Sequence, residues 1–137
     1  MSQDWDQIRA AYPEDWHEPL KFLYGLPDRY RAELEAARRP DGNTAFLVYP
    51  RRKPKLFIYQ VAPKGMHQVN FQPPKLDERL GLAGTSWSAG RLRDAFGPAV
   101  QPGEKSHYWH IALRDIDARR DAMTRFLDDV VVRLRQQ

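Results

Sequence analysis

The chain has 137 residues, a mass of 16.0 kDa and a formal net charge of +4 at pH 7, and it contains no cysteine. Disulfides, thiolate nucleophiles and cysteine-based metal centres are therefore excluded. Hydrophobic residues make up 42% and charged residues 29%, which is typical of a globular domain rather than a disordered chain. We expect a single domain over residues 1–137.

The N-terminal sequence MSQDWDQIRA is polar and acidic, unlike a secretory signal. No apolar run approaches the roughly 20 residues that a membrane-spanning helix needs. These two features predict a cytoplasmic protein with no membrane partner.

The charged residues are unevenly distributed along the chain. Residues 1–50 carry 6 basic and 9 acidic groups, whereas residues 51–75 carry 6 basic groups and no acidic group. The remainder is close to balance. The positive excess therefore lies in one segment, and this asymmetry indicates where an anionic partner would bind.

A helical N-terminal part is predicted for residues 1–40. The first helix, DWDQIRAAYP, would be capped by Asp4 and ended by Pro13. The second, DWHEPLKFLYG, would begin near Asp15 and end at Gly25. A third helix is expected in LPDRYRAELEAARRPDG, whose apolar residues recur at helical spacing.

Residues 43–73 change to an alternating pattern rich in aromatic and β-branched side chains. The segments TAFLVYP, KLFIYQVAP and MHQVNFQP predict a meander of three antiparallel strands. Pro73 and Pro74 would end the third strand, because proline cannot donate to a β-ladder.

Three more elements are predicted after the meander. Residues 86–97 form a short helix capped by Ser86 or Ser88, residues 106–113 a fourth strand, and residues 115–136 a long C-terminal helix. The apolar stripe of the last helix is Ile116, Met123, Phe126, Leu127, Val130 and Leu134. The expected fold is an α+β domain: a small antiparallel sheet, made of the three-strand meander plus a fourth strand, packed with the N-terminal helices and the long C-terminal helix.

The fourth strand, SHYWHIAL, contains two histidines on opposite faces. Because side chains alternate in a strand, His107 would lie with Trp109 and Ile111, and His110 on the other face. A single metal ion could not bridge them in a regular strand. A partly buried, hydrogen-bonded His107 is the expected arrangement.

His67 lies on an apolar face of the third strand and could approach His107 or His110 if the third and fourth strands pair. These three histidines form a possible polar site, and a histidine-based metalloenzyme is the least favoured hypothesis. The sequence has no GxSxG, P-loop, GxGxxG or HExxH motif. We therefore expect no cofactor, no resident metal and no catalytic residues.

The connection between the first two predicted strands, YPRRKPKLFIYQ, is strongly basic. The candidate binding residues, for nucleic acid or another partner, are Arg51, Arg52, Lys53, Lys55 and Lys75, with Tyr49 and Tyr59 as stacking rings. Antiparallel geometry brings the first connection and the end of the third strand to the same edge of the sheet. Converging cations release counterions on meeting phosphates, and aromatic rings on an open sheet face stack on unpaired bases.

Two binding functions follow from this basic hairpin. The first is a non-enzymatic, nucleic-acid-associated module. The second is a protein–protein interaction module, such as an inhibitor or immunity-type protein, since arginine and aromatic side chains also dominate protein interfaces. The four tryptophans and six tyrosines also leave room for a homodimer interface. Helices on both faces of the sheet would remove the stacking platform, and the acidic first segment could neutralise the basic one.

Overall fold

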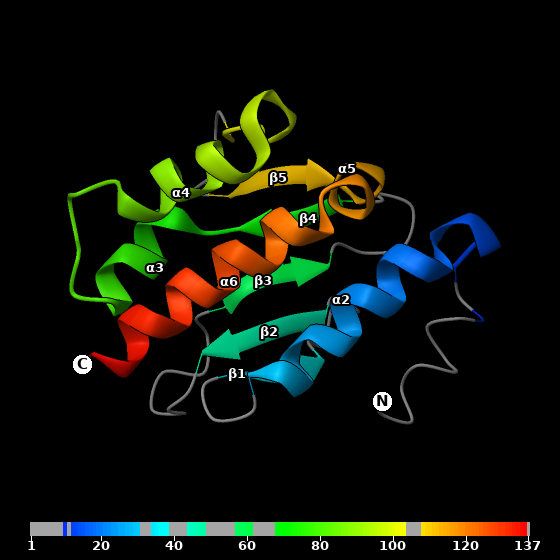
Figure 1. Ribbon diagram of the computed structural model, residues 1–137, viewed down its shortest axis with the longest axis horizontal. Coiled ribbons are helices and arrows are strands. Elements are labelled where there is room, and N and C mark those ends of the chain that lie inside the picture. Colours follow the sequence, from blue (N-terminus) through cyan, green and yellow to red (C-terminus); the bar gives the residue numbers. More distant parts are fainter. Residues whose placement is uncertain are drawn as a thin grey trace.

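The structure is a computed structural model. It describes residues 10, 12–30, 34–38, 44–48, 57–61, 68–103 and 108–136. In this part of the chain an antiparallel sheet is packed with helices, including a long C-terminal one, which confirms the predicted α+β class (Figure 1).

The first described helix is longer than the sequence indicates. A 3₁₀ turn, Glu14–Trp16 (η1), leads into α2, His17–Arg29. The prediction that one helix ends at Gly25 and another begins at Pro27 is wrong, because α2 continues through both residues. The predicted helix at residues 4–13 lies almost wholly outside the described residues.

Pro27 is accommodated in α2 by a hydrogen bond from the sheet. Proline has no N–H, so the carbonyl of Leu23, four residues earlier, loses its helical donor. The hydroxyl of Tyr59 donates to this oxygen at 2.8 Å. A buried carbonyl is thereby satisfied, and the helix passes through a residue that normally ends one.

Within the described residues the sheet has five strands in the order β1-β2-β3-β4-β5, all antiparallel. The strands are β1 Leu34–Arg38, β2 Thr44–Val48, β3 Phe57–Val61, β4 Gln68–Phe71 and β5 Trp109–Ala112. The predicted meander and fourth strand correspond to β2 to β5. The prediction of a third helix is wrong for residues 34–38, which form the strand β1.

The C-terminal half supplies the remaining helices. They are α3 Pro73–Arg79, α4 Trp87–Phe96, the 3₁₀ turn η2 Gly97–Ala99, α5 Leu113–Ala118 and α6 Arg120–Arg135. Gly97 follows α4 with a positive φ of 55°, as expected for a helix end. The predicted last helix is instead two helices, which meet at Arg119.

Helices α2 and α6 lie side by side across one face of the sheet (Figure 1). The predicted stripe of α6 faces the core: Met123, Phe126, Leu127 and Val130 are buried. Phe126 meets Phe71 of β4 edge to face, with ring centroids 5.7 Å apart.

The two faces of β3 are both buried where the structure describes them. Tyr59, which faces α2, is 0% exposed, and Ile58 on the opposite face is 1% exposed. That opposite face also carries buried amides: Asn70 donates to Gln60 at 3.3 Å. The described part of β3 therefore presents no open aromatic face.

Among the described residues, no helix is both long and apolar enough to cross a membrane.

Candidate nucleic-acid interface

Few of the predicted binding residues lie in the described part of the chain. Tyr49, Arg51, Arg52, Lys53 and Lys55 lie outside it. Lys75 is exposed on α3. Tyr59 is fully buried and its hydroxyl is bonded to Leu23, so its ring has no face for stacking and it leaves the predicted set.

The strand register fixes where the basic connection is anchored. Val48 and Phe57 are the described residues that bracket it, and Leu47 is paired with Phe57. Since Tyr59 is paired with Phe71, the start of β3 and the end of β4 lie at the same end of the sheet. Lys75, a few residues beyond β4, therefore lies at the end where the basic segment is attached, as predicted from hairpin geometry.

Helix α4 starts at this same end because α3 holds its first turn. A carboxylate oxygen of Asp77 accepts a hydrogen bond from the backbone N–H of Ser88 at 2.8 Å. The hydroxyl of Ser88 donates to the carbonyl oxygen of Pro73 at 2.9 Å. Ser86 occupies the N-cap position of α4, one of the two predicted, but its side chain makes no capping hydrogen bond, and the side chain of Asp77 caps α4 from another helix instead.

Trp87, the first residue of α4, gathers two arginines at this end. The guanidinium carbon of Arg91 lies 5.6 Å from the indole centroid, and that of Arg133, from the end of α6, lies 5.5 Å away. Both contacts are within cation–π range. Arg91 is also 4.0 Å from a carboxylate oxygen of Asp129. The indole thus contacts two cations that come from different helices.

We call the surface formed by Lys75, Trp87, Arg91 and Arg133 the basic end. In Figure 1 the C-terminal end of α6, helix α3 and the start of α4 lie at the left-hand end of the molecule, the end toward which the β2 arrow points. Exposed or partly exposed basic residues outnumber acidic ones there: Lys75, Arg79, Arg91, Arg133 and Arg135 against Glu78 and Asp129. The chain therefore has described cations next to the points that anchor its most basic segment.

Of this surface, only Lys75 was among the predicted binding residues, although the sequence carries a signal for two others. Trp87 and Arg91 are four residues apart in a predicted helix, a spacing that places them on one face. Arg133 could not be assigned to them, since its approach depends on how α6 packs against α4. A further pair missed from sequence is Arg93, whose guanidinium carbon lies 4.8 Å from the centroid of Trp109 on β5.

The predicted histidine site remains a prediction. Of its three members only His110 is described, half-buried on β5 opposite Asn70 of β4, while His67 and His107 lie outside the described residues. The described residues contain no group of three or more histidine, aspartate or glutamate side chains that could hold a metal ion.

Comparison of the chain with protein-family models, with curated proteins and with solved structures gave no match. The arrangement of side chains is therefore the basis for any statement about function.

Proposed function

We propose that the protein is a non-enzymatic binding module that associates with nucleic acid through the basic end together with Arg51, Arg52, Lys53 and Lys55. The observation that carries the proposal is the cluster in which Trp87 holds Arg91 and Arg133, next to the anchor points of the basic segment. Guanidinium groups fixed in place lose less conformational entropy when they bind phosphate. The cluster would contact the phosphate backbone, with Trp87 as its support.

A protein partner is the second candidate function. Tryptophan and arginine are the residues most enriched in interface hot spots, and here they occur as a packed cluster. A protein complex would depend less on salt than a nucleic-acid complex, since a smaller share of its free energy comes from counterion release.

The direct test is fluorescence anisotropy with labelled single-stranded DNA and RNA of about 12 nucleotides, a length within the usual site sizes. We expect the double variant Arg91→Ala/Arg133→Ala and the triple variant Arg51→Ala/Arg52→Ala/Lys53→Ala to weaken binding. The control, Arg114→Ala/Arg125→Ala, removes as many charges as the double variant from exposed positions outside the basic end. Equal weakening by the control would contradict the proposed surface. Absence of binding at low salt would favour the protein partner.

A further inference from the structure

A second surface, independent of the basic end, lies along α2 beside the first residue of α6. It is a groove of about 420 Å³ lined by Glu18, Lys21, Phe22, Gly25, Leu26, Arg29 and Arg120. Six of these residues belong to α2 and recur every three or four positions, so they form one stripe along the helix. From Glu18 to Arg29 the stripe runs about 16 Å, the length of roughly five residues of extended peptide.

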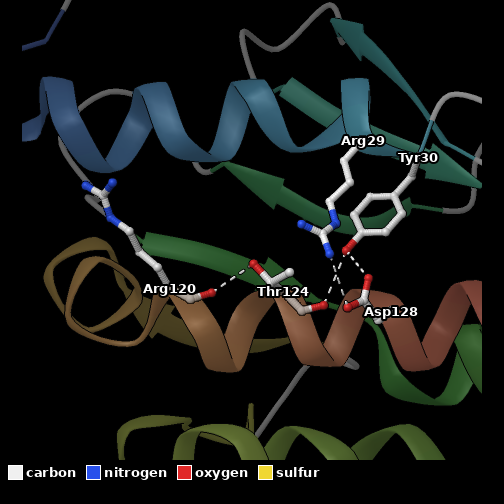
Figure 2. Close-up of polar contacts among 5 residues, drawn as sticks. All are labelled: Arg29, Tyr30, Arg120, Thr124 and Asp128. Carbon is white, nitrogen blue, oxygen red and sulfur yellow. Dashed lines mark hydrogen bonds and ion pairs between the residues drawn. The ribbon is translucent and has the colours of Figure 1, made fainter.

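Two arginines mark the ends of the groove (Figure 2). Arg120 extends from α6 toward α2, with its guanidinium carbon 5.2 Å from the ring centroid of Phe22. Arg29 extends from α2 toward α6 and lies 3.6 Å from a carboxylate oxygen of Asp128. The groove therefore has a cation near each end.

The lining is basic and partly apolar. Lys21, Arg29 and Arg120 face one acidic side chain, Glu18, while the partly exposed Phe22 supplies most of the apolar surface and Leu26, only 6% exposed, lies beneath it. The carboxylates that hold the two arginines, Asp117 and Asp128, are not part of the lining. A guanidinium has five N–H donors, so one carboxylate partner leaves donors for a ligand.

Gly25 is the residue in this stripe that calls for an explanation. It lies inside α2, where glycine costs about 1 kcal/mol relative to alanine. A Cβ placed on Gly25 would meet nothing within 4 Å, so internal packing does not require glycine. The open space above it lies in the groove, where the missing side chain lets another chain approach the helix backbone.

We infer that this groove binds a short acidic segment of a partner protein, in extended conformation and with an apolar side chain against the partly exposed ring of Phe22. Acidic side chains at the two ends of the segment would meet Arg120 and Arg29, and the peptide backbone would cross Gly25. The groove is separate from the basic end. The proposed peptide binding therefore does not depend on whether the protein binds nucleic acid.

The test is an NMR titration of the isotope-labelled full chain with the peptide DDLDD, using KKLKK as the charge-reversed control, each up to about 2 mM. We expect saturable shifts of the backbone amides of Lys21, Phe22 and Gly25 with DDLDD alone. Absence of saturable shifts, or shifts confined to the basic end, would overturn the inference. Single-stranded DNA that moves these groove amides in place of the peptide would also overturn it.

Glycine variants separate binding from stability. Gly25→Ala and Gly90→Ala place a methyl group in open space within a helix, so each should raise the Tm by about 3 °C. We expect Gly25→Ala to weaken DDLDD binding and Gly90→Ala, in α4, to leave it unchanged. Lys21→Glu, at an exposed position, should weaken it roughly fivefold. Equal peptide affinity in all three variants would contradict the inference.

Discussion

The hydrogen bond from the Tyr59 hydroxyl to the Leu23 carbonyl oxygen links the sheet to α2, the helix that covers it. It supplies the donor that Pro27 removes, and the tyrosine ring is fully buried between β3 and α2. An unsatisfied buried carbonyl costs more free energy than an ordinary hydrogen bond contributes. One hydroxyl therefore determines whether α2 can pass through proline.

Tyr59→Phe should lower the free energy of unfolding by about 1–3 kcal/mol, because it leaves the Leu23 carbonyl buried without a donor. In a Pro27→Ala background the residue at position 27 provides the helical N–H, so the same substitution should cost less. Urea unfolding of the four proteins measures both losses. An equal loss in the two backgrounds would show that the hydroxyl does not replace the missing donor.

Tyr30 makes the free energy of unfolding depend on pH in the alkaline range. Burial raises the pKa of its hydroxyl above the ordinary value of 10.0, and the Asp128 carboxylate, to which it donates at 2.6 Å, raises it further (Figure 2). Above pH 10 the unfolded chain therefore releases a proton that the folded chain retains. The contribution of this group to stability is complete below pH 10 and is lost as pH rises toward the folded pKa.

We expect the free energy of unfolding to fall between about pH 8 and pH 10.5, and to fall less in Tyr30→Phe. Urea titrations at the two pH values measure the difference. Tyr108→Phe changes a tyrosine that is 38% exposed and should retain the wild-type decrease. A wild-type decrease in Tyr30→Phe would contradict this role of Tyr30.

At the scale of elements, the carboxylate of Asp77 links α3 to the first turn of α4. Asp77 is 4% exposed and accepts the hydrogen bond from the N–H of Ser88, so it places the first turn of α4 beside α3. Trp87 precedes Ser88 directly. The geometry of the basic end therefore depends on a cap that belongs to a neighbouring helix.

Asp77→Ala should cost about 1–2 kcal/mol of unfolding free energy, the range for loss of an N-cap. Asp77→Asn keeps an acceptor oxygen and should cost less. Asp94→Ala, an exposed acid on α4, is the control and should be close to neutral. A loss in Asp77→Ala no larger than in the control, measured by urea unfolding, would exclude the cap.

The elements that the sequence predicted correctly have strong periodicity or clear ends. The alternation of β2 to β4, the stripe of α6 and the glycine after α4 belong to this class. Strand β1 was missed because LEAAR consists of good helix formers, and it becomes a strand through pairing with β2. The sequence predicts two helices in place of α2, because the hydroxyl that donates to the carbonyl left free by Pro27 belongs to Tyr59, a residue distant in sequence.

At the scale of the molecule, the sequence predicts where the cations of the candidate site lie but not how the side chains around them pack. Composition located the excess of cations in residues 51–75, and hairpin geometry located Lys75. The prediction that Tyr59 lies on an open face for base stacking was wrong, because helix α2 covers that face of the sheet. The contact of Arg133 with Trp87 depends on tertiary packing, which a single sequence does not reveal.

We propose that phosphate contacts at the basic end and in residues 51–55 account for nucleic-acid binding. The most direct measurement is the salt dependence of single-stranded DNA affinity, since each neutralised phosphate adds about 0.7 to the slope of log K against log salt. We predict that Arg51→Ala/Arg52→Ala/Lys53→Ala reduces this slope by about 2, and that Arg91→Ala/Arg133→Ala reduces it by about 1.4. Slopes equal to the wild-type value in both variants would contradict the claim.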